Sequence, residues 1–124
     1  MSEHDRTYLL FIEDIVHCID KIESYTGNLS FEDFSENDMT VDAVIRNFEI
    51  IGEAVKRIPE DIKLKYATVA WKEAAGFRDI LIHEYFGIDL EAVWDTIRMN
   101  IPVFKEQIVR VLALELGSEK RETT

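Results

Sequence analysis

Cysteine, proline and glycine are scarce in this sequence, with one Cys, two Pro and five Gly among 124 residues. A single cysteine cannot form an intramolecular disulfide, so we expect a fold held together by packing alone. The shortage of glycine and proline excludes a collagen-like or low-complexity chain. Because Cys18 falls at helical spacing among Ile15, Ile19 and Ile22, we expect a core residue there and not a reactive thiol.

Long apolar runs are missing as well. No stretch approaches the roughly 18 apolar residues that a membrane-spanning helix needs. The acidic N-terminus also lacks the basic-then-apolar order of a signal peptide. These absences predict a cytoplasmic protein with no membrane partner.

Basic residues are few, with 14 Lys and Arg against 25 Asp and Glu, which gives a net charge of −11. This balance argues against nonspecific binding to nucleic acid, because phosphate affinity depends on Lys and Arg releasing counterions. Residues 46–78 differ from the rest, since this segment has seven basic and five acidic residues. Any phosphate-binding surface should therefore lie in the middle third of the chain.

Neither the alternation typical of strands nor a solenoid-length repeat is present, and the apolar residues instead recur at helical steps of four and three. The first predicted helix begins at Asp5 or Thr7 and ends near Gly27. Four more helices are predicted, from Met39 or Thr40 to Ile58, from Pro59 to Tyr66, from about Trp71 to Phe86, and from Asp89 to Gly117. Between the first two, Ser30 and Asp33 resemble a capping box for one short turn. Pro102 should distort the last helix near residues 98–101, because proline removes an amide donor.

These elements predict an all-α fold, an antiparallel bundle of four to five helices. Residues 1–117 should form a single domain, and residues 118–124 a flexible tail. The apolar stripes on three helices exceed what one bundle can bury, which favours a homodimer.

The stretch from Phe77 to Gly87 concentrates the chemistry, because Arg78, His83 and Tyr85 fall within eight residues there. Arginine offers a fork of donors to phosphate oxygens, and histidine exchanges a proton near neutral pH. Together they suit cleavage of an RNA phosphodiester without a metal ion. On an ideal helix, however, His83 lies about 140° round from Arg78. The pair therefore requires a distorted helix end or the equivalent residues of a second chain.

The candidate catalytic and metal-binding residues also have purely structural interpretations. A histidine among Ile80 and Ile82 is more often structural than catalytic. Glu49 and Glu53 lie one helical turn apart, which could indicate a metal site or a solvated face paired with Arg46 and Arg57. We favour the ion pairs, because a metal site needs more ligands than two, and we predict neither a metal nor a cofactor.

The arrangement of Arg78, four residues, His83, one residue and Tyr85 is similar to the signature of the HEPN superfamily. Residues 77–89 resemble its HepT branch in particular, as do residues 42–54, Trp71 with Lys72, and the run from Asp89 to Trp94. The likeness extends over roughly residues 6–112.

This resemblance implies a metal-independent endoribonuclease toxin of a type II or VII-like toxin–antitoxin pair. Arg78 and His83 of two chains would meet in a cleft at the interface of a homodimer. The partner would be a nucleotidyltransferase antitoxin of the MNT type, which in some systems adds AMP to the motif tyrosine, here Tyr85. Further cleft candidates, from the similar block and from the motif, are Arg46, Asn47, Glu49, Glu53 and Asp79.

A second hypothesis keeps the fold without the chemistry. In it, the chain is a noncatalytic helical dimer that binds a nucleotidyltransferase partner. The net charge of −11 departs from what a general RNA binder needs. It fits a narrow substrate such as a structured transfer RNA, a basic antitoxin surface as the main partner, or a member that has lost activity.

Overall fold

The computed structural model describes residues 3–77, 79 and 89–123, and in that part of the chain every regular element is helical. The predicted all-α class is therefore confirmed. The elements are α1 (Glu3–Thr26), α2 (Phe31–Glu36), α3 (Asp38–Lys56), α4 (Glu60–Lys65), α5 (Trp71–Ala75), α7 (Leu90–Asp95), a π-helical turn (Thr96–Asn100) and α8 (Ile101–Thr123).

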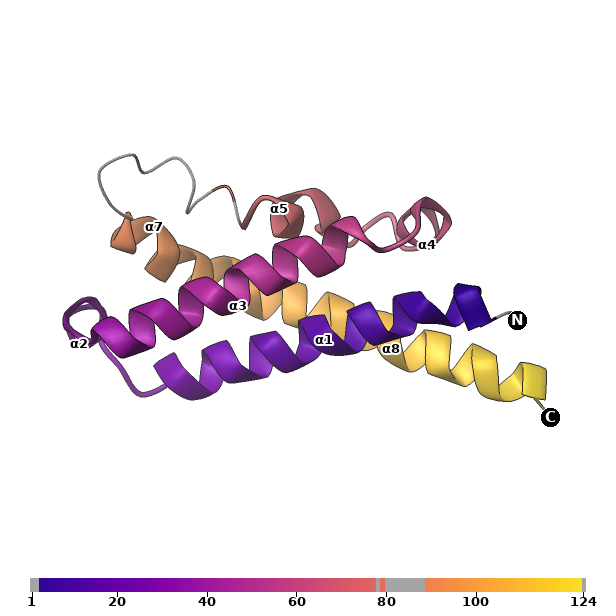
Figure 1. The fold of residues 1–124 in the computed structure, drawn as a ribbon, viewed down its shortest axis with the longest axis horizontal. Helices are drawn as coiled ribbons and strands as arrows, with labels where there is room; N and C mark the ends of the chain where they lie inside the picture. Colours follow the sequence, from indigo (N-terminus) through magenta and orange to yellow (C-terminus); the bar gives the residue numbers. More distant parts are fainter. Residues whose placement is uncertain (1–2, 78, 80–88, 124) are drawn as a thin grey trace.

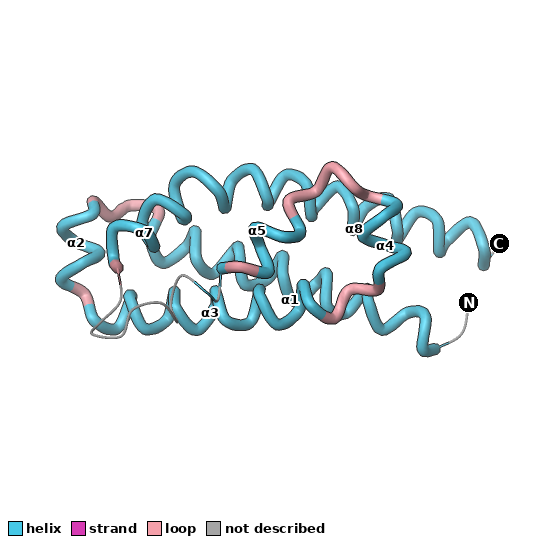
Figure 2. Tube along the Cα trace, turned by 90° about the horizontal axis from the view of Figure 1, so that it is seen from above, coloured by secondary structure: helices cyan, strands magenta, loops and turns pink. Residues whose placement is uncertain are grey.

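Three long helices form the body of the molecule, since α1 packs against both α3 and α8 (Figure 1). Seen from above, α8 runs along one side and α1 with α3 along the other (Figure 2). The short helices α2 and α7 lie at one end of this bundle, and both termini lie at the other.

The core consists of the predicted apolar stripes. Phe48 and Ile51 of α3, and Ile12 and Ile15 of α1, are completely buried. Cys18 is buried as expected, and burial raises the pKa of its thiol. Burying stripes of this kind is the main force that stabilises a bundle, because each apolar side chain removed from water contributes about 1.5–3 kcal/mol.

Local signals located the starts of α2 and α7, whereas α1 begins at Glu3 and α3 at Asp38, slightly before the predicted positions. Ser30 and Asp33 form the predicted capping box, with Asp33 N donating to Ser30 Oγ at 3.1 Å. Asn37 caps α3, and Asp89 caps α7 by accepting from Ala92 N at 3.1 Å. These side chains satisfy amide groups that have no partner inside the helix.

Two predicted boundaries are wrong. We expected one continuous helix from Trp71 to Phe86, but α5 ends at Ala75 with Gly76 as its C-cap, and Phe77 and Asp79 are helical again beyond this break. The predicted end at Phe86 lies outside the described residues. The helix predicted to stop at Gly117 continues to Thr123. Gly117 does not adopt the left-handed conformation that closes many helices, so it costs α8 some stability without ending it. The flexibility of residues 118–124 stays a prediction.

The distortion expected before Pro102 takes the form of the π-helical turn at Thr96–Asn100. Proline has no amide proton to donate to the carbonyl one turn earlier, and a wider turn accommodates that loss. The turn places Arg98 beside the end of α1, where its Nη2 donates to the carbonyls of Thr26 at 3.1 Å and Leu29 at 2.8 Å.

At the end of the bundle that holds the termini, a buried carboxylate joins three segments. Glu115 accepts hydrogen bonds from Tyr8 Oη at 2.6 Å and Lys65 Nζ at 2.8 Å, and also from the Tyr66 hydroxyl. Among the helices within residues 3–77 and 89–123, none combines the length and apolar character needed to cross a bilayer.

Candidate active site

Three central residues of the predicted site, Arg78, His83 and Tyr85, lie outside the residues that the structure describes. The structure does describe both flanks of this motif. On the N-terminal side, Phe77 is buried, with its ring 5.5 Å from that of Phe48 and 6.1 Å from that of Phe104. The residue before Arg78 is therefore fixed in the core.

On the C-terminal side, the described chain resumes at Asp89, which is the N-cap of α7. The first turns of this helix are anchored by Trp94, whose ring lies 5.1 Å from that of Phe34 and 4.3 Å from the guanidinium of Arg98. Both ends of the motif are thus anchored by aromatic contacts made by residues distant in sequence.

Asn47 is buried within α3. Its Nδ2 donates to Ala43 O at 2.8 Å, but its Oδ1 has no hydrogen-bond partner among the residues that the structure describes. A buried acceptor left in this state costs about 1–3 kcal/mol. Such an atom therefore has to be explained, and a group that binds next to α3 could satisfy it.

Arg46 and Glu49 form the ion pair that we favoured over a metal site, with Nη1 and Oε2 3.5 Å apart on an exposed face of α3. Within the described residues, no three His, Cys, Asp or Glu side chains are grouped so that they could hold a metal ion. The sharper interpretation of Glu49 and Glu53 as metal ligands receives no support from this geometry.

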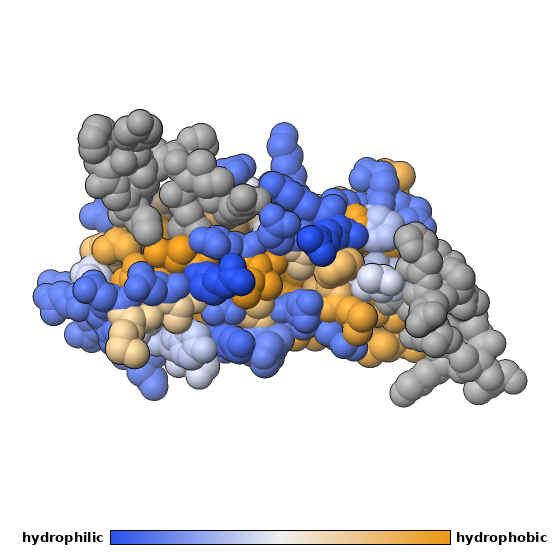
Figure 3. Space-filling model, in the orientation of Figure 1, coloured by the Kyte–Doolittle hydropathy of each residue, from blue (hydrophilic) through white to orange (hydrophobic). Residues whose placement is uncertain are grey.

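Arg46 and Glu53 do come together, in a groove of about 390 Å³ between α1 and α3. The groove has an apolar floor with two acidic and two basic side chains around it, and its lining is Phe11, Asp14, Arg46, Ile50, Glu53, Ala54 and Arg57. In space-filling view, apolar surface runs along this face of the molecule (Figure 3).

Asp79, which follows Arg78, lies elsewhere. It is exposed and lines a separate hollow of about 580 Å³ between the end of α3 and α5, together with Lys56, Lys72, Glu73, Ala75 and Gly76. The predicted cleft residues are therefore distributed over two surfaces and the core of one chain. Their meeting in one cleft stays a prediction about two chains.

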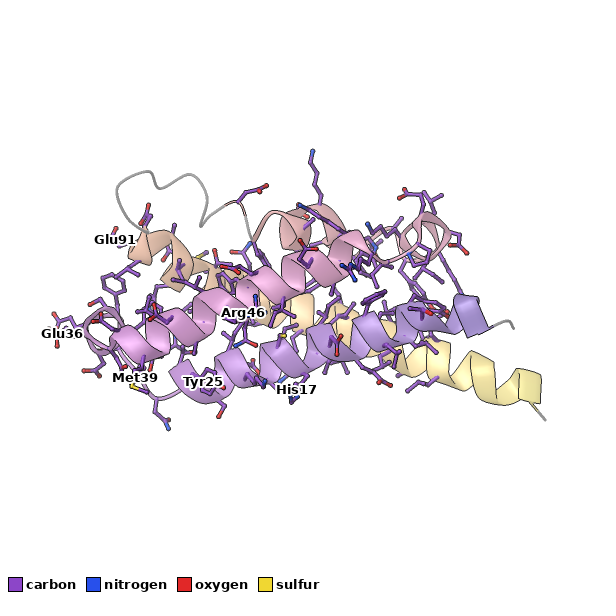
Figure 4. The ribbon with its side chains drawn as sticks, viewed as in Figure 1. His17, Tyr25, Glu36, Met39, Arg46 and Glu91 are labelled. Atoms are coloured by element: carbon purple, nitrogen blue, oxygen red, sulfur yellow. The ribbon has the colours of Figure 1, made fainter. Side chains whose placement is uncertain are left out.

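The sequence shows Lys56 and Lys72 among the basic residues of the middle third but does not indicate that they lie at the same hollow. The cluster of Glu115 with Tyr8, Lys65 and Tyr66 was not predicted, because a glutamate between two leucines gives no sign in the sequence that it is buried. The exposed His17 lies at the edge of α1 that faces away from α3 (Figure 4), apart from both the groove and the hollow.

The chain resembles known proteins over most of its length. The family model described as "Ribonuclease HepT-like" matches residues 15–111. "Probable ribonuclease HepT" of Thermococcus cleftensis is 45% identical over 100 residues, which cover 81% of this chain and 91% of that protein. "Putative RNase MJ1216" of Methanocaldococcus jannaschii is 44% identical over 102 residues, 82% of this chain and 84% of that protein.

A third relative, "Putative RNase TTE0752" of Caldanaerobacter subterraneus, is 43% identical over 106 residues, 85% of this chain and 94% of that protein. No solved structure gives a significant match. The family model and the relatives cover the helices that frame the motif as well as the motif itself. The chain therefore belongs to the family of HepT-like ribonucleases.

Proposed function

We propose that this protein is a metal-independent endoribonuclease toxin that cleaves RNA at a site built from Arg78 and His83. The observation that carries the proposal is the family membership of a chain that also contains Arg78, His83 and Tyr85 at the spacing described above. The relatives named as ribonucleases support RNA as the substrate.

The chemistry needs no group beyond these side chains. The imidazole of His83 takes the proton of the ribose 2′-hydroxyl, and the 2′-oxygen attacks the adjacent phosphorus. Arg78 stabilises the negative charge that grows on the phosphoryl oxygens. The bond to the 5′-oxygen breaks, that oxygen takes up a proton, and the products are a 2′,3′-cyclic phosphate and a 5′-hydroxyl.

One regular helix cannot direct Arg78 and His83 to the same phosphate. Of the two solutions, a distorted helix end or a second chain, the family resemblance favours the second chain. The groove between α1 and α3 supports a second copy as the occupant of that face. Its apolar floor is flanked by both signs of charge, Asp14 and Glu53 with Arg46 and Arg57. Such a surface can pair with itself across a twofold axis, as a symmetric dimer demands.

Regulation would act through Tyr85. A nucleotidyltransferase antitoxin would transfer AMP from ATP to the Tyr85 hydroxyl with release of pyrophosphate. The added phosphate would repel RNA from the cleft. Mass spectrometry of the protein co-expressed with such a partner should find one AMP on Tyr85, and a Tyr85→Phe variant should remain unmodified. Modification of another residue would contradict this assignment.

The cleavage test uses purified protein, cellular RNA and a chelator. We expect fragments that end in a 2′,3′-cyclic phosphate from the parent protein, and a loss of at least about 100-fold with His83→Ala, as for other general acid–base residues. His17→Ala is the matched control, since His17 is an exposed histidine on α1, and it should cut like the parent.

Cleavage by His83→Ala at the parent rate would overturn the role of His83. If the parent protein makes no fragments and its expression is harmless, the second hypothesis takes over, in which the chain is a noncatalytic dimer for a nucleotidyltransferase.

A further inference from the structure

The hollow between the end of α3 and α5 has a lining that the cleavage chemistry does not use. Lys56 from the last turn of α3 and Lys72 from α5 border it from two elements. Both side chains are exposed, and neither takes part in an ion pair with a described carboxylate.

Several other cations of the described chain have partners. Lys65 is bound to Glu115, Lys105 to Asp20 and Glu23, and Arg46 to Glu49. Arg98 is held by the backbone carbonyls at the end of α1. Lys56 and Lys72 thus keep their charges available within the segment where basic residues outnumber acidic ones.

The same hollow includes two carboxylates, Glu73 and Asp79, which leave it without a net charge. This mixture does not suit a simple anion site. It suits a ribose-phosphate unit, because ammonium groups bind the phosphate oxygens while a carboxylate accepts from the ribose 2′-hydroxyl. The volume of about 580 Å³ falls within the usual range of ligand pockets, and the small Ala75 and Gly76 contribute to the lining.

The hollow adjoins the motif along the chain, since Asp79 directly follows Arg78 and Gly76 precedes Phe77. We propose that this hollow binds a ribose-phosphate unit of the RNA strand beside the scissile bond, with Lys56 and Lys72 on the phosphate and Asp79 on the 2′-hydroxyl. The inference rests on the proposed function, because it takes the substrate of that reaction as its ligand.

The test measures binding of a mixed-sequence RNA oligonucleotide to the full chain at increasing salt, in the His83→Ala background so that the strand stays intact. Adding Lys56→Gln with Lys72→Gln should reduce the slope of log K against log salt by about 1.4, or about 0.7 for each lost phosphate contact on a single strand. A control pair, Lys21→Gln with Arg110→Gln, removes two exposed cations elsewhere and reaches the same net charge. It should leave the slope near that of the His83→Ala parent.

The ribose contact has its own measurement. Asp79→Ala should reduce the preference for the RNA oligonucleotide over DNA of the same sequence, because it removes the acceptor for the 2′-hydroxyl, which DNA lacks. Equal slopes for the Lys56/Lys72 and the Lys21/Arg110 double variants would overturn the phosphate site, and an unchanged preference would overturn the role of Asp79. Failure of the proposed function is a separate result, since it shows as absence of RNA cleavage by the parent protein.

Discussion

The carboxylate of Glu115 is buried, since the side chain is only 5% exposed. Burial by itself raises the pKa of this group, but hydrogen bonds from Lys65, Tyr66 and Tyr8 outweigh burial and hold the pKa below its usual value. The same contact raises the pKa of the Lys65 ammonium. The folded state therefore stabilises the charged form of Glu115.

The stability of the fold should depend on this residue in acid. Because the pKa of Glu115 is lower in the folded state than in the unfolded chain, its contribution is complete above the unfolded pKa of about 4.3 and is lost as the pH falls through the folded pKa. At neutral pH, Glu115→Gln should lower the free energy of unfolding by about 1–3 kcal/mol. Urea denaturation across a pH series measures both effects.

Glu106→Gln is the control for this variant, since Glu106 is an exposed glutamate of the same helix. It should change the free energy of unfolding by less than about 0.5 kcal/mol. An equal effect of the two substitutions would contradict the role given to Glu115.

At the scale of the elements, the π-helical turn at Thr96–Asn100 connects α7 to the C-terminal end of α1. Arg98 makes this connection with two hydrogen bonds to backbone carbonyls and a contact with the Trp94 ring. A guanidinium at a helix C-terminus also interacts favourably with the helix dipole. The wider turn thus joins the end of α1 and the connector at Leu29 to Trp94 of α7.

Arg98→Ala should lower the free energy of unfolding by about 1–2 kcal/mol, because two carbonyl acceptors lose a charged donor. Arg98→Lys should recover only part of this, since one ammonium lacks the planar fork of donors. Thermal unfolding measures the series, with Arg110→Ala as an exposed arginine control on α8. A loss with Arg110→Ala as large as that with Arg98→Ala would argue against a specific cap.

At the scale of the whole molecule, the proposed active site depends on two chains. The native mass in solution should be twice the 14.4 kDa of one chain. Ile50→Glu, which places a charge on the apolar floor of the α1–α3 groove, should shift the protein to the monomer and abolish RNA cleavage together. Met39→Glu, a substitution at an 84% exposed position of the same helix, should do neither.

A strictly monomeric parent that still cleaves RNA would contradict the two-chain site. A dimer that persists in Ile50→Glu would instead place the interface on another face.

The sequence alone determined those features that depend on residues close together along the chain. The stripe that includes Ile12, Ile15 and Ile19 is buried because a helix brings residues three and four apart onto one side. Asn37 and Asp89 start helices because their side chains reach amides three residues on. The composition and the spacing of Arg78, His83 and Tyr85 likewise pointed to the family from local information.

Only the tertiary structure decided which distant residues meet. Tyr8 and Glu115 are 107 residues apart in sequence, and Lys65 and Glu115 are 50 apart, so no local pattern could pair them. The same holds for Lys56 with Lys72 at one hollow and for Phe77 between Phe48 and Phe104. Helical periodicity selects the face that is buried, whereas the packing of helix on helix selects its neighbours, and that choice depends on shape and charge across the whole bundle.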